Sequence, residues 1–128
     1  MILKANYFQG GSSTEFDNYA LYMSSLKRVR DLAPDTVYTG HGIVEGRETI
    51  DRYIAHRTHR ENAVLRTLRA QERPVSVEDL TAEVYKADNL VNAVLVAAAG
   101  RIVGLMLEKM RGEGAAVAGA GGLWTALQ

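Results

Sequence analysis

Residues 89–128, NLVNAVLVAAAGRIVGLMLEKMRGEGAAVAGAGGLWTALQ, decide the fold of the C-terminal part of the chain. Apolar residues recur there at helical spacing, which predicts a helix that starts at Asn89 and is closed by Gly112 and Gly114. Two short apolar runs around residues 119–122 then predict a β-hairpin. The expected buried stripe of the helix is Val91, Val94, Leu95, Ala98, Ile102, Leu105, Met106 and Met110.

Two further helices are predicted just upstream of this segment. A long helix over residues 47–71 carries apolar residues at Ile50, Tyr53, Ile54, Val64, Leu65 and Leu68. Arg73-Pro74 follows it, and Ser76 is placed to cap a second, shorter helix. Three helices followed by a hairpin are the layout of a winged helix.

The N-terminal third predicts a strand, a helix and a second strand. Residues 2–8 can form the first strand, and residues 13–32 form an amphipathic helix with Ser12 as its cap and Glu15 completing a capping box. Residues 36–39 are rich in β-branched and aromatic side chains and predict a strand that ends at Gly40. The fold class expected for the whole chain is therefore α+β and mostly helical.

Composition excludes several classes of function. The 128 residues carry 15 basic and 15 acidic side chains, so no overall field favours nucleic acid or a membrane surface. Because the chain contains no cysteine, disulfides, thiolate metal sites and cysteine nucleophiles are excluded. The N-terminus lacks the continuous apolar core of a signal peptide, and no segment predicts a membrane helix. We expect an intracellular protein, cytoplasmic or mitochondrial.

The stretch Val37–Val44, VYTGHGIV, places His41 between two glycines at the end of a predicted strand. Glycines on both sides allow the backbone to approach a ligand closely, which suits a metal or substrate site. An ordinary turn has the same pattern, so the residues alone leave both interpretations open.

Three separated motifs together resemble a known family. They are YMSSL at Tyr22–Leu26, YTGHG at Tyr38–Gly42 and YIAHRTHRE at Tyr53–Glu61. Their order and spacing are similar to those in the C-terminal part of metallo-β-lactamase-fold hydrolases, in the beta-lactamase-like protein 2 subfamily. The resemblance implies that residues 1–46 are the last part of the hydrolase domain, and that residues 47–128 are a connecting helix and a winged-helix-like domain.

The resemblance also implies site residues and a cofactor. His41 corresponds to the last metal ligand of a two-zinc site, and Asn6 occupies the slot of the aspartate that bridges the metals. Asparagine is a neutral and weaker ligand, and the family's upstream H-x-H-x-D-H motif is absent from this chain. Because zinc sites need three or four protein ligands, we expect no catalytic residue here and no hydrolysis by these residues without a partner.

The reaction implied for the complete family is metal-assisted hydrolysis of a phosphodiester, thioester or ester, and the subfamily is associated with cleavage of single-stranded RNA. His56, Arg57 and Arg60 on the long helix are candidates for binding a substrate phosphate or carboxylate. The alternative is a solvated or inter-domain helix face in which Asp51 and Glu61 pair with the arginines.

Partners are predicted from the last helix and the hairpin. The helix has no basic residue before Arg101 and the hairpin has none, which argues against sequence-specific DNA binding. A helix that is apolar on more than one face needs a covering surface. We therefore expect one of two partners to cover this helix. It is either a second copy in a homo-oligomer, or a missing N-terminal hydrolase half, in which case this chain is a fragment of the complete protein. The alternative function is a non-catalytic oligomerisation or protein-interaction module of hydrolase ancestry.

Overall fold

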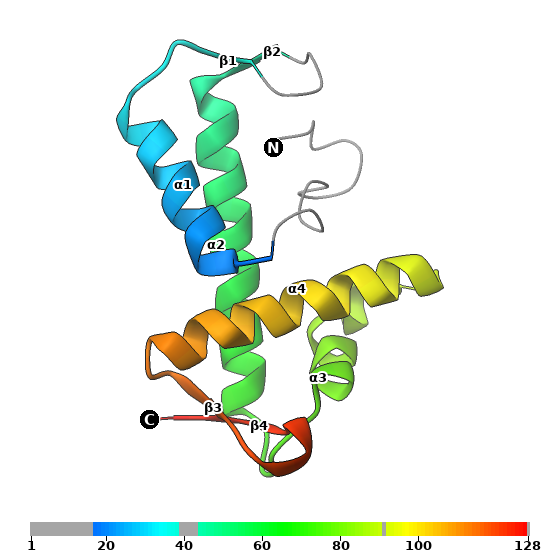
Figure 1. The fold of residues 1–128 in the computed structure, drawn as a ribbon. Coiled ribbons are helices and arrows are strands. Elements are labelled where there is room, and N and C mark those ends of the chain that lie inside the picture. Colours follow the sequence, from blue (N-terminus) through cyan, green and yellow to red (C-terminus); the bar gives the residue numbers. More distant parts are fainter. Residues whose placement is uncertain (1–16, 39–43, 91, 128) are drawn as a thin grey trace. The chain divides into compact units, whose positions relative to one another are not determined.

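The computed structural model describes residues 17–38, 44–90 and 92–127, and helices dominate it (Figure 1). The predicted class, α+β and mostly helical, is confirmed. The helices are α1 (Tyr19–Asp31), α2 (Arg47–Arg69), α3 (Val77–Val84) and α4 (Ala93–Gly112), with short 3-10 helices η2 (Lys86–Asp88) and η3 (Ala120–Gly122). The strands are β1 (Thr36–Tyr38), β2 (Val44–Gly46), β3 (Ala116–Ala118) and β4 (Trp124–Ala126).

Two compact units divide the chain, Met1–His59 and Arg60–Gln128, and the division falls inside α2. The predicted domains, residues 1–46 and 47–128, follow from family resemblance rather than from compactness, and they stay a prediction. In the parts of the chain that the structure describes, no helix is both long enough and apolar enough to cross a membrane.

The first helix is shorter than predicted. Asn18 lies in extended backbone and its side chain accepts a hydrogen bond from the Leu21 amide at 2.9 Å, so the helix begins at Tyr19 rather than at residue 13. The predicted cap, Ser12, lies outside the described residues. Tyr19, Met23 and Leu26 are buried at the expected spacing, whereas Val29 is exposed.

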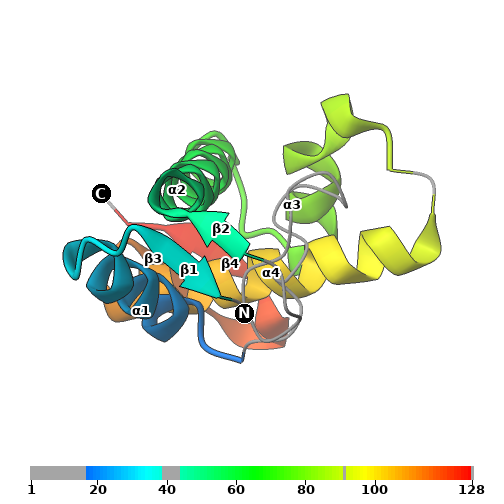
Figure 2. The ribbon, with the colours of Figure 1, turned by 90° about the horizontal axis from the view of Figure 1, so that it is seen from above.

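The strand predicted over residues 36–39 is confirmed as β1, but its partner was not predicted. β1 pairs with β2 antiparallel, with Thr36 opposite Gly46 and Tyr38 opposite Val44 (Figure 2). β2 consists of Val44, Glu45 and Gly46, so it lacks the run of β-branched and aromatic residues that predicted β1. The strand predicted over residues 2–8 lies outside the described residues.

The long helix and the cap of the second helix are confirmed. α2 has the predicted course, with Ile50 and Tyr53 buried in its first part and Val64 and Leu68 in its second. Ser76 caps α3 because its side-chain oxygen accepts a hydrogen bond from the Asp79 amide at 3.1 Å.

The start of the last helix was placed too early. Asn89 adopts the left-handed conformation and ends η2, and Asn92 caps α4 by accepting hydrogen bonds from the amides of Val94 at 2.8 Å and Leu95 at 3.3 Å. The buried residues of α4 are Ala99, Ile102, Val103, Met106, Leu107 and Met110. Val94, Leu95 and Val96 are exposed, so the first turn of α4 does not belong to the core.

The predicted C-terminal hairpin is confirmed, and a residue from outside the hairpin also pairs with it. β3 pairs with β4 antiparallel, and Val75 forms an isolated bridge to Trp124, with N–O distances of 3.0 and 2.8 Å. Ala116 and Trp124 are buried, so this small sheet packs one face on the core of its unit. Three helical segments followed by a hairpin are thus present, and the identification as a winged helix stays a prediction.

Candidate functional site

The two predicted metal-site residues, His41 and Asn6, lie outside the described residues. Tyr38 and Val44, which flank the segment that carries His41, are partners in the antiparallel pair of β1 and β2. Within residues 17–38, 44–90 and 92–127, no three histidine, aspartate or glutamate side chains gather closely enough to hold a metal ion. The described part of the chain therefore does not by itself fit a zinc centre.

Arg57, one of the three candidates for substrate binding, is an interior residue of the first unit. Its residue exposure is 3%, and its guanidinium lies over the ring of Tyr22, 6.0 Å from the centroid. Its carbonyl oxygen accepts a hydrogen bond from the Tyr19 hydroxyl at 3.2 Å. These contacts connect α1 to α2, so Arg57 contributes to helix packing through both its side chain and its backbone.

Arg60 belongs to the second unit and contacts the segment after α3. Its guanidinium lies 4.3 Å from the centroid of the Tyr85 ring and forms an ion pair with Asp88 at 3.2 Å. A cation over an aromatic ring and beside a carboxylate is held by two independent attractions. Arg60 therefore fixes the position of Tyr85 and of η2.

The acidic partner of Arg60 differs from the one expected. The sequence predicted pairing of the arginines with Asp51 and Glu61, but Glu61 pairs with Lys109 at 2.8 Å. Lys109 also contacts Glu113 at 2.9 Å on its own helix. Arg60 instead forms its ion pair with Asp88, which lies in η2, after α3 in the chain. The third candidate, His56, is half-buried on the same helix.

Lys109 is held between two carboxylates. Burial by itself lowers its pKa, but hydrogen bonds and charge interactions with Glu61 and Glu113 outweigh burial and raise the pKa above its usual value of 10.5. The Lys109 and Glu61 side chains are 17% and 18% exposed, so this pair is partly shielded from water. The cluster is a structural ion pair that joins α4 to α2 within the second unit.

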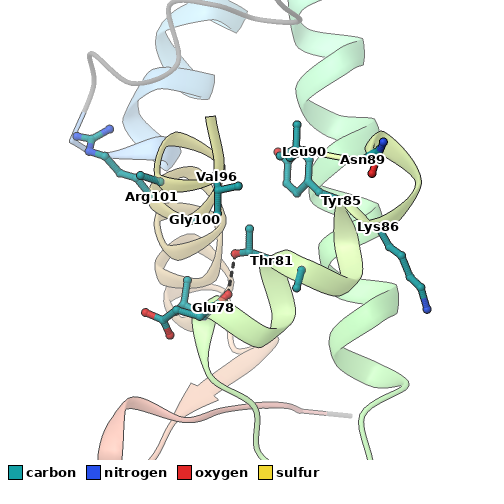
Figure 3. Close-up of a pocket in the computed structure, with 12 residues that line it drawn as sticks. Glu78, Thr81, Tyr85, Lys86, Asn89, Leu90, Val96, Gly100 and Arg101 are labelled. Carbon is teal, nitrogen blue, oxygen red and sulfur yellow. Dashed lines mark hydrogen bonds between the residues drawn. The ribbon is translucent and has the colours of Figure 1, made fainter. Parts of the chain in front are cut away.

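A groove with a volume of about 700 Å³ lies between α3, η2 and the first half of α4 (Figure 3). We call it the α3–α4 groove. It is lined by Val77, Glu78, Thr81, Ala82, Tyr85, Lys86, Asn89, Leu90, Val96, Ala97, Gly100 and Arg101. Sequence reasoning missed it because the exposed start of α4 was assigned to the core. The methyl group of Ala97 and the absence of a side chain at Gly100 were the available signal for a hollow there.

Comparison with known proteins gives a relationship over part of the chain. No family model matches. Over 78 residues the chain is 37% identical to the "Beta-lactamase-like protein 2 homolog" of Caenorhabditis elegans. This matched region covers 59% of this chain and 26% of that protein. Over 82 residues it is 33% identical to the protein of the same name from Drosophila melanogaster, covering 60% and 27%. The matched region spans about a quarter of the length of these curated relatives.

Proposed function

This chain is related to the metallo-β-lactamase-like proteins, and from that premise we propose that it is the C-terminal part of a metal-dependent hydrolase. The observation that carries the proposal is the identity of 37% over 78 residues with a curated beta-lactamase-like protein 2 homolog. The family-type reaction is hydrolysis of a phosphodiester, of RNA, or of a thioester. Since the match covers 26% of that relative, the proposal is that this chain supplies only part of the active centre.

In this proposal His41 is one ligand of a zinc site whose other ligands come from outside this chain. The described residues on either side of the segment that carries His41, Tyr38 and Val44, are partners in the pairing of β1 with β2. Asn6 takes the slot of the bridging aspartate and contributes little, because a neutral amide does not supply the negative charge that a two-metal bridge needs. The isolated chain is accordingly expected to be inactive.

The three candidates for substrate binding on α2, His56, Arg57 and Arg60, have separate roles in the proposal. The ring and backbone contacts of Arg57 and the ion pair of Arg60 favour positioning of α2 over direct contact with substrate. Binding of a substrate phosphate or carboxylate is proposed for His56, which is half-buried on α2. The second unit is proposed to be a winged-helix-like domain, with single-stranded RNA as the family-type partner.

A second candidate function is a non-catalytic oligomerisation or protein-interaction module. The observation that favours it is the exposed apolar start of α4, where Val94 is 75% exposed and Leu95 and Val96 are also accessible. Exposed branched side chains that are adjacent on one helix are typical of a surface that another molecule covers.

Metal content decides between the two candidates. Elemental analysis of protein purified without a histidine tag or chelator measures zinc and manganese per chain, with a His41→Ala variant as the control. Near-stoichiometric metal that is lost in His41→Ala supports the hydrolase proposal, with the remaining ligands supplied across an oligomer interface. Absence of metal makes His41 a relic and favours the interaction module. Metal that His41→Ala retains contradicts the role of His41.

A further inference from the structure

We propose that the α3–α4 groove and the exposed start of α4 form a two-fold symmetric interface with a second copy of this chain. The inference rests on the second candidate function, to which it gives a partner, and does not depend on the metal site. All the residues that line the groove lie in the second unit, so the surface is complete within one compact part of the chain.

The first half of α4 presents an apolar face where a solvated helix normally carries polar residues. Ala93, Val94, Val96 and Ala97 are all exposed, and no charged residue occurs between Leu90 and Gly100. At 3.6 residues per turn these four exposed side chains lie within about 160° of one another around the helix. An apolar face of this kind indicates a surface that another molecule covers.

The groove continues this apolar face from α4 to α3. Val77 and Ala82 on α3 and Leu90 after η2 line it together with Ala97. Gly100 has no side chain, so the middle of the surface is formed by two of the smallest residues, Ala97 and Gly100. Small residues at this point let the axis of α4 approach a second helix closely, toward the lower end of the usual range of about 8–10 Å.

Charges near the two ends of α3 make the surface complementary to itself. Glu78 lies in the first turn of α3, and Lys86 lies in η2, beyond the other end (Figure 3). Arg101 also lines the groove but already interacts within the chain, whereas Glu78 and Lys86 form no ion pair in the described part of the chain. A two-fold axis that crosses α3 between Glu78 and Lys86 sets α3 antiparallel to α3 of the second copy. Each Glu78 then lies beside Lys86 of the other copy.

This order of charges favours a second copy over a simple ion or a uniformly charged partner. Because Glu78 and Lys86 have opposite signs, a single charge gains at one end of the groove what it loses at the other. A matching partner carries the same two charges in the reverse order, on both sides of an apolar centre. A second copy meets this requirement by symmetry alone, and the interface gains two charge contacts together with the burial of apolar surface.

The size of the surface predicts a weak dimer. α3 has 8 residues and the exposed half of α4 has a similar number, so each segment is about 12 Å long at 1.5 Å per residue. Two helical segments of this length give an interface smaller than the usual size of about 800 Å² per partner. We therefore expect a dissociation constant of about 10–100 µM.

Sedimentation equilibrium of the full chain, from about 5 to 500 µM, measures dimerisation and tests the charge pairing. Glu78→Lys and Lys86→Glu should each weaken the homodimer at least about tenfold, because like charges then meet at both contacts. An equimolar mixture of the two variants should recover dimerisation to within about threefold of the unmodified chain, because opposite charges meet again at both contacts. Glu83→Lys is the matched control, since it makes the same charge change on α3 outside the groove lining and should leave dimerisation unchanged.

The apolar part of the surface is tested by Ala97→Glu, which should weaken the dimer at least about tenfold by placing a charge at its centre. Gly112→Glu is its control on the same helix, because no other part of the described chain lies within 4 Å of a Cβ at that position. Circular dichroism identifies variants that do not fold. If Glu78→Lys is one of them, Lys86→Glu and Ala97→Glu test the same surface.

Three results would overturn the proposal. They are a chain that stays monomeric at about 500 µM, a dimer that Lys86→Glu and Ala97→Glu leave intact, and a mixture of the two charge variants that does not dimerise. None of these results decides the second candidate function, which is tested separately by the metal content of the chain and its His41→Ala variant.

Discussion

The Glu61–Lys109–Glu113 cluster gives the most quantitative test of how the second unit is held together. Lys109→Met removes the ammonium group and keeps a long apolar side chain against the helix. Glu61 then retains a carboxylate whose side chain is 18% exposed and has lost its cation at 2.8 Å. A partly buried charge without its partner is the expected source of the destabilisation.

The magnitude follows from the exposure of each partner. A hydrogen bond between charged groups with little exposure contributes about 1.5–3 kcal/mol, which applies to the Lys109–Glu61 pair. Glu113 is 53% exposed and four residues from Lys109 on the same helix, where such pairs contribute about 0.3–0.5 kcal/mol. We therefore expect Lys109→Met to lower the free energy of unfolding by about 2–3 kcal/mol and Glu113→Gln by about 0.5 kcal/mol or less.

Urea unfolding at pH 7, followed by far-ultraviolet circular dichroism, measures both variants against the unmodified chain. A double-mutant cycle between residues 61 and 109 should give a coupling of about 1–2 kcal/mol, well above that between residues 109 and 113. The reasoning is refuted if Lys109→Met costs no more than Glu113→Gln, because burial of the Glu61 pair would then have no energetic effect.

The remaining predictions concern pH, capping and glycine geometry. Because the folded-state pKa of Lys109 is raised above 10.5, its stabilisation is fully present below that pH and is lost as pH rises through the folded-state pKa. The stability difference between the unmodified chain and Lys109→Met should thus be constant from pH 7 to about pH 9 and should shrink above pH 10.5, measured by urea unfolding. Asn92→Ala should cost about 1 kcal/mol by removing the cap of α4, whereas Asn92→Ser should largely preserve stability; equal losses in the two variants would contradict the capping role. Gly100→Ala should raise the free energy of unfolding by up to about 1 kcal/mol, because the added Cβ meets only an ordinary van der Waals contact. Gly114→Ala should lower it by about 1 kcal/mol, because Gly114 has φ +77°. If thermal unfolding ranks the two variants in the opposite order, this geometry is contradicted.

The elements that the sequence predicted correctly are those with strong local signals. α2 is marked by a long apolar periodicity, α3 by a serine at its cap, and the hairpin by apolar runs around a glycine-rich turn. In each case the residues that determine the structure lie within a few positions of one another. Local backbone and capping preferences were therefore sufficient.

The start of α4 shows where local signals compete. Asn89 and Asn92 are both good caps, and the left-handed conformation of Asn89 at the end of η2 leaves the capping role to Asn92. The shift of three positions from Asn89 to Asn92 changes which side chains begin the buried stripe. Val94 and Leu95 consequently lie outside the core to which the sequence pattern assigned them.

The contacts that shape the candidate sites are long-range and could not be predicted from spacing. Glu61 and Lys109 are 48 positions apart, and Arg60 and Asp88 belong to separate elements, α2 and η2. The α3–α4 groove likewise depends on how two helices meet. Helix periodicity identifies which face is apolar, but it does not identify the partner or the gaps between them.

Zinc titration of an Asn6→Asp variant tests the central claim, that this chain carries part of a hydrolase metal site, most directly. Zinc affinity is measured by titration calorimetry and compared in the unmodified chain, in Asn6→Asp and in Asn6→Asp combined with His41→Ala. The account predicts that Asn6→Asp tightens zinc binding at least about tenfold and that His41→Ala removes the gain. Unchanged affinity in Asn6→Asp, or a gain that survives the loss of His41, would contradict it.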